Sequence, residues 1–445
     1  MASVGAEQWS SRFAFIMAAV GSSVGLGNLW RFSAELGTNG GAAFLVIYLV
    51  CIILVGIPVL MSEFMIGRAG QAASAVGSQA DIAVRSGVSR SWSAGAWFGM
   101  VSSFLIVSFY CVVAAWVLNY LVKFLGNSFS GLPAGDIAAK FPSMVGNPVS
   151  VLPYFLIFAG LTTWLVARGV NKGIETSARL LMPLFFILLA GLALYSIFSG
   201  MESGGTGQAL GFMFAPDFSR ITPEVMISAL GQACFSIGIG NAIMITYGSY
   251  LPGNVDIPRA AVGISLIDTL VAVTAGLAIF PIVFSNELDF RAGAGIFFQT
   301  LPIALAEHAY IGAAFFFLAF FAAITSSVSL LEPTTAYVSE KFGIGKAEAA
   351  ALTGIAITAL GFGSLYSQDF FKFIDQGLVA PILAPMSALL VVLFTGWRLS
   401  KTIIKEQFSS GSENLGNVLM VFVRYIAPIF VAVILVMSVW DRYFT

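Results

Sequence analysis

Long apolar segments dominate this sequence, and they leave few folds open to it. A helix that crosses the hydrocarbon core of a bilayer needs about 20 mainly apolar residues. Eleven segments of the chain come close to that length, so the sequence predicts an all-α, polytopic membrane protein. The predicted spans are 13–36, 41–66, 95–124, 152–168, 178–198, 223–250, 257–284, 307–338, 347–365, 373–396 and 417–440.

The composition agrees with burial in lipid and excludes several classes of function. Charged residues make up 10% of the chain, against roughly 25% in soluble globular domains. The net charge of −1 gives no indication of a nucleic-acid partner. The three cysteines lie inside apolar segments, and their spacing fits neither a disulfide framework nor a metal site. With His308 as the only histidine and no G-x-x-x-x-G-K-[ST] motif, we expect neither an enzyme nor an ATP-driven pump.

Lysine and arginine residues set the expected orientation. Most of them fall in loops that face the cytoplasm if the N-terminus is inside, as the positive-inside rule requires. With eleven spans, the C-terminus is then outside, and the protein is expected in the cell (inner) membrane. The segment 1–12 lacks the pattern of a signal peptide, so we expect the first span to be retained. The Gly/Pro/Ser-rich stretch 125–151 is expected to be a polar connector.

A six-residue motif occurs twice, in the middle of two apolar segments. Residues 23–28 read S-V-G-L-G-N, and residues 236–241 read S-I-G-I-G-N. The copies lie five spans apart and therefore have opposite topology. Glycine costs about 1 kcal/mol in a helix interior relative to alanine, so each motif can break its helix. Close packing through small residues would explain one copy, but paired breaks in inverted halves are typical of a transporter's binding site.

Polar residues at membrane depth are functional candidates. Glu63 either accepts hydrogen bonds from N–H groups freed by the breaks or has a purely structural role. Asp268 stands in an apolar stretch, where a buried carboxylate is costly unless it is paired or binds an ion. Arg31 and Asp375 are expected near the outer mouth, as a gate or as an ordinary interfacial pair. Glu332 precedes Pro333 and is expected to satisfy freed backbone, whereas Arg424 has no partner that the sequence indicates.

At these residues the chain resembles the neurotransmitter:sodium symporter family, which includes LeuT-type bacterial amino-acid transporters of eleven spans. The resemblance implies a single transporter domain over 1–445 with the LeuT fold. Two inverted five-helix repeats would cover 13–198 and 223–396, with an extra helix at 417–440. The stretches that carry the resemblance are 25–32 (GLGNLWRF), 40–44 (GGAAF), 56–68 (GIPVLMSEFMIGR), 168–175 (RGVNKGIE) and 245–250 (ITYGSY).

The resemblance also implies a site for one or two Na⁺ ions and a substrate. The first sodium site would use Ser23, Asn28, Ser236 and Asp268. The second would use Gly21, Val24, Ala322, Thr325 and Ser326. The substrate would contact Ser22, Ser23, Leu26, Gly27, Ile106, Tyr110, Phe235, Ser236, Gly238, Asn241, Ser326, Ser327 and Leu330. The outer gate would be Arg31 with Asp375, and Glu340 would supply the acid of the inner gate.

Three residues depart from the family pattern. Asp268 replaces the usual asparagine, and its carboxylate would compensate the charge of sodium, so we expect no chloride dependence. Ala6 stands where the inner gate normally has an arginine, and Arg12 is a weak substitute. Asn241 replaces a large apolar or aromatic side chain, which with Gly238 predicts a roomier and more polar pocket.

The sequence therefore predicts sodium-coupled symport of a small amino acid into the cytoplasm by alternating access. Its partners would be the amino acid, sodium and the lipid bilayer, with the chain as a monomer or weak dimer. Three alternatives stay open: proton coupling through Asp268, a non-α-amino acid such as taurine or GABA, and a non-transporting sensor on the same fold. A channel fits less well, because selectivity filters are rings of repeated elements rather than two asymmetric breaks.

Overall fold

The structure is a computed structural model that describes residues 8–291, 295–409 and 411–444. Helices make up the fold, and the described residues contain no β-strand. The helices of the first half are α1 (Arg12–Ser23), α2 (Phe32–Thr38), α3 (Ala42–Cys51), α4 (Ile57–Gly70), α5 (Ala75–Arg85), α6 (Ala94–Leu125), α7 (Ala134–Val145), α8 (Pro148–Ala167), α9 (Thr176–Ser199) and α10 (Gly205–Phe214). Those of the second half are α11 (Pro223–Ile237), α12 (Ile243–Ser249), α13 (Ile257–Ser285), α14 (Leu301–Ala304), α15 (Ala309–Phe342), α16 (Lys346–Tyr366), α17 (Gln368–Lys372), α18 (Ala384–Leu393), α19 (Lys401–Phe408), α20 (Glu413–Val421) and α21 (Ala427–Tyr443).

The spans predicted from apolar length correspond to helices of the structure. In the described part of the chain, nine continuous helical stretches are long and apolar enough to cross a membrane. A tenth span is the pair 12–23 and 27–38, which bends by 51° at its break. The segment predicted at 223–250 is two short helices, α11 and α12, separated by residues 238–242. Both breaks therefore fall on the repeated motif, as predicted.

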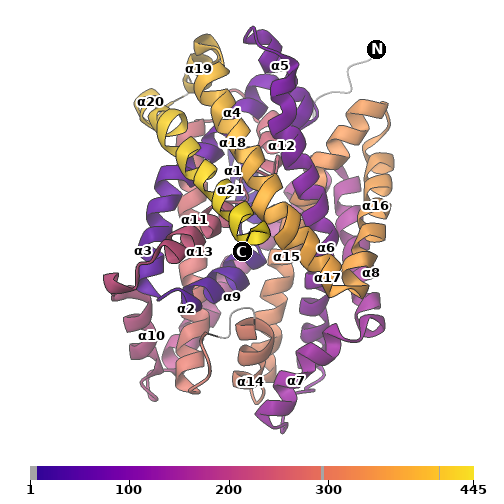
Figure 1. The fold of residues 1–445 in the computed structure, drawn as a ribbon. Helices are drawn as coiled ribbons and strands as arrows, with labels where there is room; N and C mark the ends of the chain where they lie inside the picture. The colour runs from indigo at the N-terminus through magenta and orange to yellow at the C-terminus, as the bar shows by residue number, and fades with distance from the viewer. Residues whose placement is uncertain (1–7, 292–294, 410, 445) are drawn as a thin grey trace.

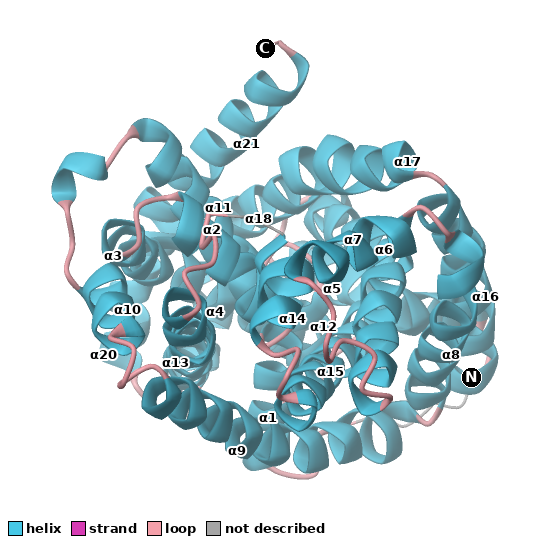
Figure 2. Cartoon of the chain, turned by 90° about the horizontal axis from the view of Figure 1, so that it is seen from below, coloured by secondary structure: helices cyan, strands magenta, loops and turns pink. Residues whose placement is uncertain are grey.

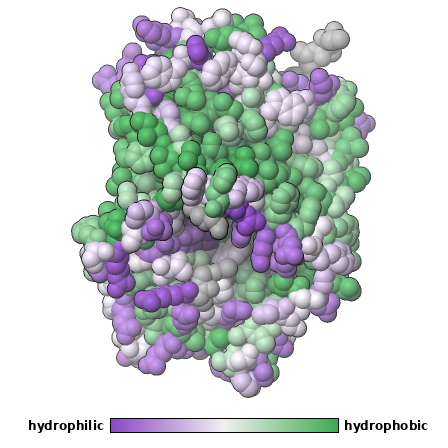
Figure 3. All heavy atoms as spheres, viewed as in Figure 1, coloured by the Kyte–Doolittle hydropathy of each residue, from purple (hydrophilic) through white to green (hydrophobic). Residues whose placement is uncertain are grey.

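The surface shows where the bilayer fits. On the face shown in Figure 3, hydrophobic residues form a broad band across the molecule, with hydrophilic residues above and below it. The helices run roughly along one direction between these two polar ends (Figure 1). Because an apolar band of this kind is stable only against lipid tails, the arrangement agrees with a multi-pass membrane protein.

The expected connector at 125–151 is only partly a loop, because it contains the helix α7. The apolar residues of α7 face the bundle, with Ile137 and Met144 buried and Phe141 stacked on Phe298 at 4.7 Å between ring centroids. The Gly/Pro/Ser content of the stretch concealed this periodicity. α5, α10 (in the loop before α11) and α19 are further short helices outside the predicted spans.

The packing places both breaks beside long, continuous helices. α6 and α15 pack along each other, α1 and α12 pack on α15, and α4 packs on α12. Seen from below, α1, α12 and α15 lie inside the ring of helices, while the C-terminal part of α21 extends away from it (Figure 2). The broken backbone is thus enclosed by protein, which is where irregular structure at membrane depth is tolerated.

Candidate substrate and sodium site at two broken helices

The first break is a short extended segment between α1 and the π-helical turn η1 (Gly27–Arg31). Val24 has extended backbone angles, so the helix ends at Ser23. The freed N–H of Gly25 donates to the Asn28 side chain at 3.2 Å, and the N–H of Leu26 donates to the Tyr110 hydroxyl at 3.4 Å. A Cβ atom at Gly25 would lie 2.6 Å from Ser326 Oγ, so glycine is needed for this close approach.

The second break is longer and is held from two sides. Gly238, Gly240 and Ala242 all adopt left-handed backbone angles, which end α11 and redirect the chain into α12. The N–H of Gly240 donates to Glu63 Oε1 at 2.7 Å, and Glu63 is fully buried. This contact confirms that Glu63 accepts a hydrogen bond from backbone freed by a break. From α6, the Ser103 hydroxyl donates to the carbonyl of Asn241.

Asp268 of α13 lies between the two breaks, fully buried and surrounded by hydrogen-bond donors. Asn28 Nδ2 is 2.8 Å from its Oδ1, and the Ser236 hydroxyl donates to its Oδ2 at 2.6 Å. Asn28 Nδ2 also lies 3.0 Å from Ser236 Oγ, and the Tyr48 hydroxyl lies 3.2 Å from the same oxygen. Three of the four residues predicted for the first sodium site are thus in direct contact. Ser23 lies next to them, with its hydroxyl 3.1 Å from the carbonyl of Ile237.

A second group of oxygens joins α1 to α15. Ser326 Oγ lies 3.2 Å from the carbonyl oxygen of Ser22, and 3.5 Å from those of Gly21 and Val24. On the same helix, Thr325 Oγ1 lies 3.2 Å from the carbonyl oxygen of Ala322. Neutral oxygens of this kind suit a hard cation. The five residues predicted for the second sodium site therefore lie together.

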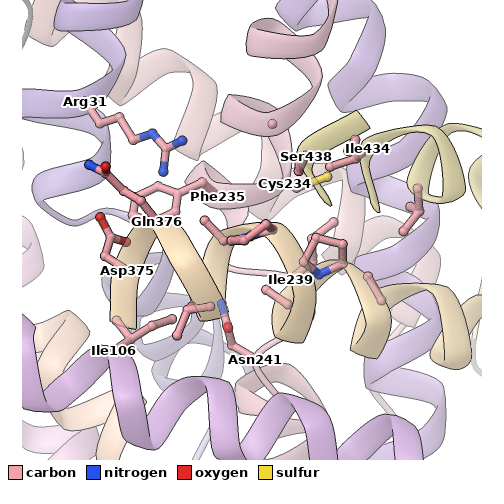
Figure 4. Close-up of a pocket in the computed structure, with 18 residues that line it drawn as sticks. Arg31, Ile106, Cys234, Phe235, Ile239, Asn241, Asp375, Gln376, Ile434 and Ser438 are labelled. Atoms are coloured by element: carbon pink, nitrogen blue, oxygen red, sulfur yellow. The ribbon is translucent and has the colours of Figure 1, made fainter. Parts of the chain in front are cut away.

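Two cavities lead from one end of the bundle to the breaks. One, of about 330 Å³, reaches Leu26, Gly27 and Tyr110. The other, of about 270 Å³, reaches Ile106 and Asn241 (Figure 4). Phe235 lines both cavities and is 38% exposed, so it does not seal the site from this side.

Among the remaining residues predicted to contact substrate, Ser327 lies differently from expectation. Its side chain is fully buried, and its hydroxyl is 2.8 Å from Thr162 Oγ1 on α8. Ser327 therefore faces the helix behind α15 rather than either of these cavities. Leu330 is buried one turn after Ser326, and the position of a Cβ at Gly238 is open space.

The two charged residues predicted as the outer gate both line these cavities, but they are not joined. Arg31 stacks over the Phe235 ring at 4.3 Å and lies 3.8 Å from Glu35. Among the described residues, no ion pair within 4.0 Å links Arg31 to Asp375; Figure 4 shows Gln376 beside both. The pathway at this end is open.

The opposite end is closed by the N-terminal segment. The Trp9 indole donates to the carbonyl of Tyr247 at 3.0 Å, and the Trp9 N–H donates to that of Tyr250 at 3.1 Å. The N–H of Ser10 donates to Glu175 Oε2 at 3.0 Å, which joins this segment to the turn before α9. Ala6 lies outside the described residues, and Arg12 is exposed.

Glu332 has a different role from the one expected beside Pro333. It is fully buried and pairs with Lys346 at the start of α16, and the Tyr250 hydroxyl donates to it at 2.6 Å. Lys346 was missed as a partner because it lies beyond the span predicted at 307–338, and only the turn between α15 and α16 brings it back to Glu332.

Two other charged residues contact backbone. Glu340, predicted as the acid of the inner gate, instead accepts the N–H of Ser74 at 2.6 Å. Arg424, for which no partner was predicted, donates to the carbonyl of Gly396 at 2.8 Å.

Comparison with known proteins identifies this architecture. The profile of the Sodium:neurotransmitter symporter family matches residues 6–135 and 145–443. The chain belongs to this family. As a member of the Sodium:neurotransmitter symporter family it is a sodium-dependent transporter rather than an enzyme.

Individual members of the family align over almost the full chain. The uncharacterized sodium-dependent transporter YhdH of Bacillus subtilis is 36% identical over 96% of both chains. An uncharacterized sodium-dependent transporter of Haemophilus influenzae is 30% identical over 98% of both. The crystal structure of MhsT in complex with L-phenylalanine is 37% identical, with a TM-score of 0.88, and the match covers 98% of this chain and 100% of MhsT. The LeuT fold expected from the sequence is therefore confirmed.

Proposed function

We propose that this transporter carries a small amino acid together with Na⁺ into the cytoplasm by alternating access, without a requirement for chloride. The observation that carries the proposal is the position of the Asp268 carboxylate. It touches Asn28 of the first broken segment and Ser236 of the second. A cation bound to this carboxylate would contact both broken segments at once.

The geometry suits a zwitterion beside that cation. The first break is followed by the start of η1, where the positive end of the helix dipole favours a carboxylate. The Tyr110 hydroxyl, 3.4 Å from the N–H of Leu26, could donate to the same carboxylate. Each bound charge lowers the cost of burying the other, so substrate and Na⁺ would increase each other's affinity by the same factor. That MhsT is known in complex with L-phenylalanine supports an amino acid as substrate.

Chloride independence follows from charge balance at the same place. A buried cation is costly unless an opposite charge accompanies it. Asp268 supplies one negative charge within the protein, which balances one Na⁺, and a zwitterionic substrate adds no net charge. An additional anion is then unnecessary.

The expected orientation places the N-terminus in the cytoplasm, so the end of the bundle closed by Trp9 faces the cytoplasm. The open cavities then face outward, and this conformation corresponds to the outward-facing state of the proposed cycle. Occupation of the site would draw Arg31 and Asp375 together over Phe235. Inward opening would require Trp9 to leave α12 and Tyr250 to leave Glu332, which keeps Lys346 as its counter-charge.

The test is uptake by purified protein in liposomes. Pooled radiolabelled amino acids are offered with an inward Na⁺ gradient or an equal choline gradient, each with chloride or gluconate. We expect concentrative uptake with Na⁺ in both anions and none with choline. Uptake driven by a proton gradient alone, or only in chloride, would contradict the proposal, and no uptake in any pool would favour a sensor or a non-α-amino acid. In the matched variant Asp268→Asn, uptake is expected to weaken or to become dependent on chloride.

A further inference from the structure

The cavity of about 270 Å³ behind Phe235 forms a chamber that reaches the far end of the expected substrate site. Its walls come from α11 on one side, from the π-helical segment η7 (Phe373–Leu383) and the following helix α18 on another, and from α21. Its lower end reaches Ile106 and Asn241, and its walls include Ile239, Val379 and Ile434 (Figure 4). The extra helix α21 thus contributes to a space that is continuous with the end expected to hold a substrate side chain.

The glycines beside this chamber leave additional room. A Cβ atom at Gly231 or at Gly238 would have no neighbour within 4 Å. Apart from its polar outer mouth, the chamber is walled mainly by aliphatic side chains and proline rings. A side chain much longer than that of alanine is therefore needed to fill it.

One polar group stands out at the lower end of this apolar chamber. Asn241 is 93% buried, since its relative exposure is 7%, and its amide points between Ile106 and Ile239 (Figure 4). Its Oδ1 accepts the Ser102 hydroxyl at 2.8 Å, and Nδ2 has one long contact of 3.4 Å with the carbonyl of Gly238. An amide has two N–H donors and two acceptor lone pairs. Asn241 therefore retains an N–H for a further partner.

Two serines of α6 fix the position of that amide. Ser102 holds the side chain, and Ser103 donates to the Asn241 carbonyl. A side chain locked in this way is preorganised, so it can discriminate between ligands without losing further conformational freedom. Because an apolar ligand would cover the free N–H without pairing it, binding such a ligand carries a desolvation penalty.

We infer that Asn241 selects amino acids whose side chain is neutral, long enough to reach the chamber, and carries a hydroxyl or carboxamide oxygen near its end. This inference rests on the proposed function and specifies the substrate class of the same site. The substrate's side-chain oxygen would accept the free N–H of Asn241, while the aliphatic walls contact the carbons between. An apolar amino acid of equal size would bind less tightly.

The experiment compares pairs of amino acids that differ by one polar group. Purified protein in detergent with saturating Na⁺ is titrated with threonine against valine, glutamine against methionine, and tyrosine against phenylalanine. We expect the polar member of at least one pair to bind roughly 10-fold more tightly, the effect of one hydrogen bond together with the avoided loss of an unpaired donor. The pair with the largest ratio of affinities, polar over apolar member, indicates the distance from the substrate backbone to Asn241.

The variant Asn241→Leu keeps a similar side-chain volume without the amide. The ratio of affinities for the polar and apolar members of a pair is therefore expected to fall to about 1 or to invert. Ile434→Ala, at the apolar wall, is the matched control: it should change the affinity of both members of a pair and keep their ratio. If Asn241→Leu does not fold, Asn241→Ala tests the same loss.

Two outcomes separate this inference from the proposed function. If wild-type protein binds valine, methionine and phenylalanine as tightly as their polar partners, the inference is overturned, while sodium-dependent amino-acid binding stands. If no amino acid binds in Na⁺, both fail. An unchanged ratio in Asn241→Leu would assign the selectivity to another residue and would also overturn the inference.

Discussion

The two broken segments share one sequence motif, yet they meet its structural demands in different ways. In the first copy the freed backbone is satisfied partly within the segment, by Asn28, and partly by Tyr110 of α6. In the second copy it is satisfied by a buried carboxylate from α4 and a serine from α6. The first break thus supplies one of its own partners, whereas the partners of the second come from the neighbouring helices α4 and α6.

The asparagine at the end of each copy shows the same difference. Asn28 is completely buried and bonds to Asp268 and Ser236, so it belongs to the proposed sodium site. Asn241 lines the chamber instead. The comparison teaches that a repeated motif specifies where a helix breaks, whereas its surroundings specify what the break does. The following predictions test that difference, from the largest expected effect to the smallest.

Gly240→Ala should be the most damaging change in either motif. Gly240 has φ of +76°, and a Cβ there would lie 2.3 Å from the carbonyl oxygen of Ala384. Left-handed strain costs about 1–3 kcal/mol for a non-glycine residue, and the clash with fixed backbone adds to it. We expect a loss of folded protein, measured by thermal unfolding in detergent.

The equivalent position in the first copy is the control. Gly27→Ala would meet only the ring edge of Phe235, at 2.8 Å, which can rotate away. It should remain folded and mainly affect uptake. Equal stability of the two variants would mean that the second break is no more constrained than the first.

Asn28→Ala should weaken Na⁺ binding by about 10-fold or more, because hydrogen bonds to charged groups contribute about 1.5–3 kcal/mol. The measurement is the Na⁺ concentration for half-maximal uptake. Asn241→Ala removes the corresponding residue of the other copy and, at saturating substrate, should leave this concentration nearly unchanged. A similar loss of Na⁺ affinity in both variants would break the proposed division of roles.

Glu63→Leu should destabilise the protein by about 1–3 kcal/mol, since it leaves the buried N–H of Gly240 without its acceptor. Glu63→Gln, which retains an acceptor oxygen, should be much milder. The free energy is obtained from the shift in the thermal transition. If leucine and glutamine were equally tolerated, the second break would not depend on this support.

Gly238→Ala should have the smallest effect. Its φ of +73° carries strain, but a Cβ there meets open space. We expect about 1 kcal/mol of destabilisation, with uptake of small substrates retained. Uptake of long substrates should fall, because the new methyl group enters the room beside the chamber; uptake assays with a short and a long amino acid check this. Equal uptake of both would show that this room is not used.

Much of the fold could be predicted because its signals are local. A run of apolar residues identifies a span without knowledge of its neighbours, and the two glycine-rich motifs located both breaks. The helix α7 was missed because its apolar residues are sparse in a stretch rich in glycine, proline and serine. Two groups of oxygens, one around Ser326 and one around Asp268, were expected on the family resemblance, and the structure forms both groups.

Contacts between distant segments were less accessible from the sequence. Glu332 was expected to satisfy backbone groups freed by Pro333, but its partners are Lys346 and Tyr250. Ser327 was placed in the pocket, but one residue of helical rotation turns it toward Thr162. The expected pair of Arg31 and Asp375 is open, because pairing between two rigid segments depends on the conformational state of the whole bundle.

The sequence by itself determined where the chain crosses the membrane, where two crossings break, and which family of transporters it belongs to. These properties follow from apolar length, backbone propensity and short motifs, all of which are local. Only the tertiary structure decided which polar groups meet: that Asp268 joins both breaks, that Glu63 supports the second, and that Asn241 faces a chamber walled by α21. Such meetings depend on the packing of helices far apart in the chain, which no single segment encodes.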